Sequence, residues 1–583
     1  MDQLRVDRPR GSLPRDKVCR IYRWETRMCA FALLGMFYTG LKCSRCRQMS
    51  TMQSSGHAKP CYVWLSDDAV FSTDLRPRLG CMSRYQRRQF LFSTAGSLGL
   101  SQVLGGLGPL SAAEVKFEAG IARFSNEIEP LVEFLETTPR DRVIEETARR
   151  VQAGLSYRHL LTALLLAGVR NVQPRPSVGF KFHAVLVVNS AHLASISCAD
   201  EDRWLPIFWA IDNFKSSQQR DIAEGNWTLA AVNEAKVPPA HLASKQLRAS
   251  LDKWDVEGAD VAITSLVRNS GSQRVFDELS HYAARDFRSI GHKVIYLSNA
   301  FRTLQTIGWE YAEPVMRSLV YAMLNHHGSP NPSESDQEAD RPGRYNRELL
   351  EKLPDHWHGK RLDDGASVDL VSTLYDCTPQ EASQKVVALI SDGISLQSIW
   401  NAIYASAGEL MMRQRGIVAL HSVTTTNAIR HAFQNATHAK TRQYLLLQNA
   451  SFLPMFREAA RGRGALADRR ITSLGTSESP VSPTAVEDTF VLMGKDRLAA
   501  AEQLYGYLEN EGDPQAVVDH ARRLVFLKGN DSHDYKFSSA ALEDYRGLSP
   551  IWRNRFLASS VFQLRSSTES TRPIVERINN ALS

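Results

Sequence analysis

The stretch Phe182-His183-Ala184-Val185-Leu186-Val187-Val188-Asn189-Ser190-Ala191-His192 returns in diverged form as Leu420-His421-Ser422-Val423-Thr424-Thr425-Thr426-Asn427-Ala428-Ile429-Arg430-His431. The residues before each copy also match. Ala153-Gly154-Leu155-Ser156 precedes the first copy, and Asp392-Gly393-Ile394-Ser395 precedes the second. Because spacing is kept as well as composition, we interpret the two stretches as equivalent parts of an internal repeat.

Other histidines follow the same register. His281 and His292 correspond to His520 and His533, at separations of 239 and 241 residues, close to the 238 residues between His183 and His421. This pattern predicts a tandem duplication, with residues 114–347 as the first half and 348–583 as the second. Residues 331–346 are rich in Pro, Ser, Asp and Glu and are expected to form the linker at the seam.

The periodicity of both halves is helical. Apolar residues recur at three-and-four spacing over Ile121–Glu136 and Asp141–Ala153, and Tyr157–Val169 is apolar nearly all round. We expect further helices at Gln273–Arg288 and His292–Ile307, and one continuous helix bearing His183 and His192. The predicted fold class is all-α, with two similar helical halves around a pseudo-twofold axis.

The charge of the chain is concentrated near its N-terminus. The formal net charge is +7, and residues 1–81 alone hold 14 Lys and Arg against 7 Asp and Glu. Residues 82–113 add three arginines, so the remainder is slightly acidic. A nearly neutral body gives no electrostatic reason to expect nucleic acid as a partner.

Residues 82–113 resemble a twin-arginine signal peptide. Met82 is followed by the pair Arg87-Arg88, a mildly apolar run, and Ser111-Ala112-Ala113 before Glu114. We therefore expect export to the periplasm or another extracytoplasmic space, with no stable membrane anchor after cleavage. Since a signal should begin a chain, residues 1–81 are expected to be a non-native, disordered extension.

Four histidines each follow a glycine closely: His183, His292, His421 and His533. Glycine suits the turn that starts a helix, so each imidazole should lie in the first turns, where the helix dipole favours its neutral form. Neutral imidazole can bind a metal or act as a general base. We name these four as candidate catalytic residues. His281 and His520, one helix earlier, could approach the same space as cofactor-binding residues.

Familiar catalytic motifs are missing from the body of the sequence. His-Glu-x-x-His, Gly-x-Ser-x-Gly and a phosphate-binding glycine loop do not occur, and the single Glu278-x-x-His281 is not repeated before His520. The metal, if any, is therefore not defined by the sequence. A His-ligated metal remains one option for the cofactor.

The segments around His421 and Ile290-Gly291-His292-Lys293 resemble short pieces of questin oxidase-like helical proteins. That resemblance implies oxidation of an aromatic or quinone-like small molecule in a His-lined cavity at the junction of the two halves. The alternative is an exported, non-catalytic helical binding or scaffold protein whose histidines are structural. Rings that converge from both halves would favour the enzyme, and rings buried separately on backbone carbonyls would favour the scaffold.

Overall fold

Helix starts follow the signals present in the sequence. Ser156 and Ser395 are N-cap residues, and each hydroxyl accepts a hydrogen bond of 3.2 Å from the backbone N–H three residues later. Gly154 and Gly393, two residues before these caps, both have positive φ, which glycine adopts without strain. The repeated Gly-x-Ser therefore forms the same turn and cap in both copies.

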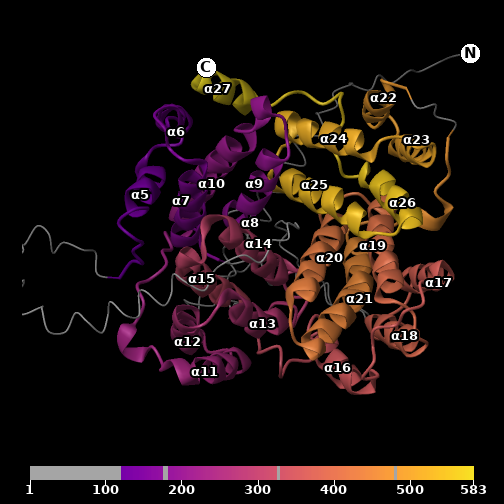
Figure 1. Ribbon diagram of the computed structural model, residues 1–583, viewed down its shortest axis with the longest axis horizontal. Coiled ribbons are helices and arrows are strands. Elements are labelled where there is room, and N and C mark those ends of the chain that lie inside the picture. Colours follow the sequence, from indigo (N-terminus) through magenta and orange to yellow (C-terminus); the bar gives the residue numbers. More distant parts are fainter. Residues whose placement is uncertain (1–119, 175–181, 325–328, 478–481) are drawn as a thin grey trace, which may run out of the picture. The chain divides into compact units, whose positions relative to one another are not determined.

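The computed structural model describes residues 120–174, 182–324, 329–477 and 482–583 (Figure 1). All of them belong to one compact unit. The predicted extension 1–81 and the predicted signal peptide 82–113 lie outside the described residues. The helices up to the predicted seam are α5 (Glu129–Thr137), α6 (Val143–Gln152), α7 (Tyr157–Asn171), α8 (His183–Leu186), α9 (Val188–Ile196), α10 (Leu205–Glu224), α11 (Ala240–Lys253), α12 (Val256–Asn269), α13 (Ser272–Ala283), α14 (His292–Ile307), α15 (Ala312–Leu324) and α16 (Arg341–Leu349).

The helices after the seam complete the fold. They are α17 (Asp364–Leu374), α18 (Pro379–Ser391), α19 (Leu396–Arg413), α20 (Ile417–Asn435), α21 (Ala439–Arg461), α22 (Ala485–Leu492), α23 (Arg497–Glu509), α24 (Pro514–Lys528), α25 (Ser532–Asp544), α26 (Pro550–Ser560) and α27 (Pro573–Leu582). Within the described ranges β-structure is limited to isolated bridges such as Ile121 with Ala230. The all-α prediction is confirmed.

Buried helices from the two halves pack directly on one another. Helix α14 packs on α20, α20 on α25, and α25 on α9, close to the middle of Figure 1. The start of α14 lies close to the middle of α20: Gly291 has a φ of 86°, and a Cβ there would lie 2.0 Å from Thr425 Oγ1. Glycine is therefore required where α14 begins.

Two helices near the ends of the halves pack across the seam. Helix α16, which spans the predicted seam, lies against α18 and α21 of the second half. Helix α27, at the C-terminal end, lies against α6 and α10 of the first half. Each half is thus covered by a helix that follows the other half in sequence.

Several predicted boundaries were wrong. Ile121 does not start a helix, because it bridges to Ala230 and α5 begins only at Glu129, followed by Pro130 at a position that suits proline. Part of the predicted linker 331–346 is helical, since α16 starts at Arg341. Helix α13 ends at Ala283 rather than Arg288.

The helix of His183 is interrupted. Val187 separates α8 from α9 but keeps right-handed helical backbone angles, so the two segments form one irregular helix.

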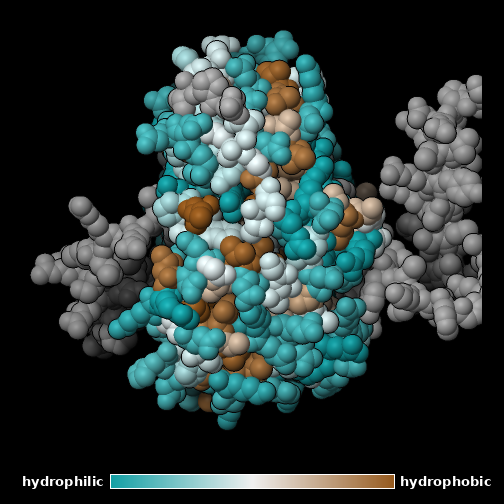
Figure 2. All heavy atoms as spheres, turned by 90° about the vertical axis from the view of Figure 1, so that its right-hand side faces the viewer, coloured by the Kyte–Doolittle hydropathy of each residue, from teal (hydrophilic) through white to brown (hydrophobic). Residues whose placement is uncertain are grey.

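The face seen in Figure 2 is mostly hydrophilic and carries small groups of apolar side chains. Among the described helices, none combines the length and hydropathy needed to cross a bilayer.

Candidate functional site

Four histidine rings from both halves meet in the interior. The centroid of His183 is 6.0 Å from that of His292 and 5.7 Å from that of His533. The centroid of His421 is 4.9 Å from that of His292 and 5.8 Å from that of His533. Each imidazole therefore contacts two others. The four side chains together form a closed cycle, which we call the histidine ring. The structure brings together all four candidate catalytic residues.

The helix starts place these side chains. His183 and His292 are the first residues of α8 and α14, His533 is the second residue of α25, and His421 lies one turn into α20. Asp531 caps α25 and accepts a hydrogen bond from the backbone N–H of His533 at 2.8 Å. Four helix N-terminal ends therefore point their first side chains into one space.

Hydrogen bonds fix the orientation and tautomer of two rings. His292 Nδ1 lies 2.5 Å from the carbonyl oxygen of Ser289, and His421 Nδ1 lies 2.6 Å from that of Ile417. A carbonyl oxygen only accepts, so Nδ1 must carry the proton and Nε2 keeps its lone pair. His533 Nδ1 lies 2.8 Å from Asp531 Oδ1. His292 Nε2 is buried and has no hydrogen-bond partner among the described residues.

Burial keeps these imidazoles neutral. Burial, and after it the charge of nearby Lys536, lower the pKa of His292 to about 3 against the opposing effect of the Ser289 carbonyl. The pKa values of His421 and His533 are held well below 6.5, mainly by burial. At neutral pH these three imidazoles of the histidine ring therefore present nitrogen lone pairs rather than positive charges.

Lys536 is a site residue that sequence reasoning missed. Its side chain is completely buried, one turn beyond His533 on α25, and its charge lowers the pKa of His292, His421 and His533. The spacing of three residues on a helix was a usable signal, because such residues share a face. One cation thus lies beside three neutral imidazoles.

A second buried polar group lies further along the same helices. Asn427 of α20 donates to Asp544 Oδ1 at 2.6 Å, and the Tyr404 hydroxyl donates to the same oxygen at 3.0 Å. Burial, with Glu543 beside it, raises the pKa of Asp544 well above its ordinary value. Sequence analysis gave no sign of this buried acid.

His281 and His520 contact other aromatic rings. His281 lies against Tyr444 with centroids 4.2 Å apart, and His520 against Phe490 at 4.7 Å. Among the ring contacts of the described residues, neither reaches the histidine ring. The expected sharing of one space by all six histidines is not seen.

The histidine ring meets only part of the requirements of a metal site. A second nitrogen held by a carbonyl or carboxylate is typical of metal-binding histidines. Nevertheless, in the described part of the chain no three His, Cys, Asp or Glu side chains are placed to hold an ion together. The Lys536 ammonium would also repel a cation. The donors present here do not fit a metal.

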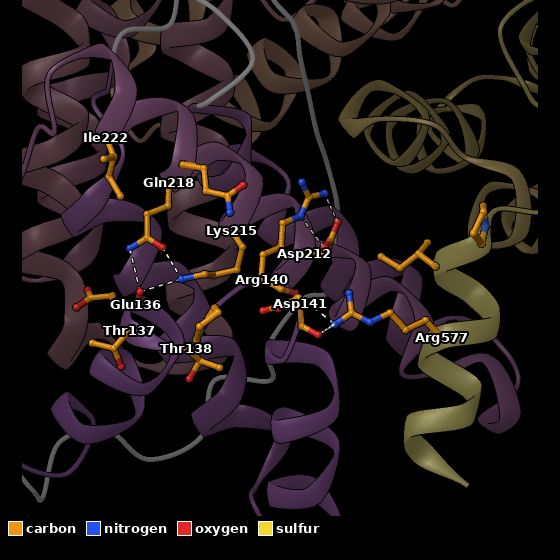
Figure 3. Close-up of a pocket in the computed structure, with 14 residues that line it drawn as sticks. Glu136, Thr137, Thr138, Arg140, Asp141, Asp212, Lys215, Gln218, Ile222 and Arg577 are labelled. Atoms are coloured by element: carbon orange, nitrogen blue, oxygen red, sulfur yellow. Dashed lines mark hydrogen bonds and ion pairs between the residues drawn. The ribbon is translucent and has the colours of Figure 1, made fainter.

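An open pocket of about 950 Å³ lies between α10, the end of α5 and α27, and none of the four histidines lines it (Figure 3). Its polar side chains are already engaged. Lys215 donates to the carbonyl oxygens of Leu135 and Glu136, and Arg140 pairs with Asp212. These contacts join α10 to the end of α5 and the start of α6, which explains the pocket lining without a ligand.

No protein-family model, curated protein or solved structure matches this chain.

Proposed function

We propose that the histidine ring and Lys536 bind a small aromatic molecule with an acidic hydroxyl, such as a phenol or hydroquinone, and remove its proton. The observation that carries this proposal is the convergence of four imidazoles from both halves, with the buried Nε2 of His292 lacking a hydrogen-bond partner within the described part of the chain. A lone pair accepts the hydroxyl proton, and Lys536 stabilises the oxyanion that forms.

The low imidazole pKa values are compatible with this role. In the free protein, burial and Lys536 disfavour a proton on His292 and His421. A phenolate beside the rings would supply the missing negative charge and raise their pKa values. Proton transfer then produces an imidazolium and a phenolate side by side, a pair in which each charge stabilises the other.

The reaction we propose is oxidation, in line with the resemblance to questin oxidase-like proteins. A hydroquinone loses two protons and two electrons to become a quinone, and dioxygen takes both to become hydrogen peroxide. The imidazoles receive the hydroxyl protons first, because an anionic hydroquinone gives up electrons more readily than a neutral one.

We also infer that the two halves arose by duplication. The order α5 to α15 is followed again by α17 to α26, with α8 and α9 together matching α20. Contacts recur too: α12 packs on α15 as α23 packs on α26, and α16 covers the second half as α27 covers the first. A twofold axis through the histidine ring would exchange His183 with His421 and His292 with His533. This exchange relates the His183–His292 distance of 6.0 Å to the His421–His533 distance of 5.8 Å, and the His183–His533 distance of 5.7 Å to the His421–His292 distance of 4.9 Å, so the first pair of distances agrees closely and the second less so.

Purified protein titrated with 4-nitrophenol, whose absorbance reports its ionisation, tests the site. We expect the phenolate band to increase on binding. His292→Ala and His421→Ala should abolish the change, while the exposed control His241→Ala should keep it. Oxygen uptake with 1,4-naphthohydroquinone should likewise be lost in His292→Ala and His421→Ala and kept in His241→Ala.

Unchanged binding and turnover in both ring variants, with circular dichroism showing intact helices, would instead support the scaffold alternative. One observation favours that alternative: His292 and His421 do bond to backbone carbonyls, as structural histidines do. A stoichiometric metal in the purified protein, lost in both variants, would contradict the metal-free site.

We further propose export through the twin-arginine route, on the strength of Arg87-Arg88 and the apolar run that follows. Mass spectrometry of protein from the extracytoplasmic fraction should find a mature N-terminus near Glu114. Peptides from before residue 82 in that fraction would contradict it.

A further inference from the structure

A second pocket, of about 760 Å³, lies between helices of the two halves and away from the histidine ring. Helix α11 contributes Arg248, helix α13 contributes Arg274, Glu278 and His281, and His438 and Thr441 come from the start of α21. Arg274 and His281 are seven residues apart on α13, so they lie on one face, about 10.5 Å apart along the axis at 1.5 Å per residue.

The acidic groups of this pocket already have partners. Asp277 accepts a hydrogen bond of 2.7 Å from the backbone N–H of Thr437, and Glu278 pairs with Arg248 at 2.9 Å. Glu278 therefore has a cation of its own, and both oxygens of Asp277 are held by Thr437.

His281 and Arg274 lack acidic partners. The His281 ring lies against Tyr444, and among the described residues it makes no hydrogen bond. Arg274 donates to the neutral hydroxyl of Ser244 at 2.9 Å and forms no ion pair within the described ranges. Behind His281, Arg285 and Arg347 add positive charge, which together with burial lowers its pKa to about 3. The local field therefore favours an anion at the imidazole.

The matching position in the second half shows what satisfies such an imidazole. His520 Nε2 lies 3.1 Å from Glu487 Oε2 and 3.3 Å from Ser567 Oγ. This comparison rests on the duplication inferred above. The second half supplies a carboxylate of its own to this histidine, and the first half leaves the corresponding space open.

We propose that the His281 pocket binds a small dicarboxylate, with one carboxylate on the His281 ring and the other on Arg274. The separation of these two groups along α13 is too long for a single carboxylate and suits a chain of four or five carbons. The pocket is distinct from the histidine ring, so its ligand is an effector or a second substrate rather than the proposed phenol.

Calorimetric titration of the full chain with succinate, glutarate and acetate tests the proposal. We expect succinate or glutarate to bind at least tenfold more tightly than acetate. His281→Phe keeps a ring against Tyr444 but removes the nitrogens, and Arg274→Gln changes only an exposed side chain. Both should weaken dicarboxylate binding at least tenfold, whereas the matched control His520→Phe should leave it unchanged.

Three results would overturn the proposal. They are no binding of either dicarboxylate at millimolar concentration, acetate binding as tightly as glutarate, and dicarboxylate binding that survives both His281→Phe and Arg274→Gln. Because these measurements use no phenol, they are independent of the function proposed for the histidine ring.

Discussion

Lys536→Met is expected to weaken binding of 4-nitrophenolate at least tenfold and to remove the increase in its phenolate band. Lys536 is completely buried and acts on three rings of the site. Removing one partner of a buried ion pair costs about 3–5 kcal/mol, because the other charge is left buried without compensation. Without it the phenol should bind, if at all, in its neutral form.

The same substitution should increase the stability of the fold at acid pH, although it weakens ligand binding. Lys536 lowers the pKa of His292, His421 and His533, so its removal raises these values towards 6.5. The protein should then resist acid unfolding better, even though it has lost its ligand. Denaturant titrations at pH 7 and pH 5 measure this, with exposed Lys495→Met as the matched control. Unaltered phenolate binding in Lys536→Met would rule out its proposed role.

Stability is expected to fall steeply as the pH drops below about 6.5. Burial lowers the pKa of His192 to about 4 and those of His281 and His292 to about 3. At pH values between these pKa values and about 6.5, the histidines are protonated in the unfolded chain and neutral in the folded chain. Each group therefore costs up to about 1.4 kcal/mol of unfolding free energy per pH unit.

Above pH 6.5 these histidines are neutral in both states and contribute no pH dependence. Glu409 acts in the other direction between about pH 4.5 and pH 7, because burial raises its pKa from 4.5 to about 7, and over that range it offsets about one histidine. His192→Gln should reduce the slope between pH 6.5 and pH 4 by about 1.4 kcal/mol per unit. The exposed control His241→Gln should not. Equal slopes in the two variants would contradict this assignment.

Particular residues show how far sequence reasoning reached. The common register of His183, His292, His421 and His533 identified the four rings that converge. The same register also grouped His281 and His520 with them, although these two face Tyr444 and Phe490. A matched spacing predicts which positions of two stretches correspond, but it does not tell which of the histidines lie together in the interior.

Groups that occur in only one half could not be found from the repeat. In the register of the repeat, Ile295 corresponds to Lys536 and Thr303 to Asp544. The repeat therefore gave no signal for Lys536 or Asp544. The boundary at α16 was missed for a related reason. Its Pro342 and Gly343 indicate a linker by composition, whereas packing on α18 and α21 makes the segment helical.

The sequence alone determined that the chain is helical and where matched imidazoles occur, because helix periodicity, caps and repeats are local or pairwise properties of the chain. Tertiary structure decided that four of those imidazoles share one interior and that two do not. It also decided that Lys536 is buried beside three of them and that Asp544 is buried at the far end of the same helix. The physical reason is that burial, and with it the pKa of each group, depends on which helices from distant parts of the chain exclude water from the same place.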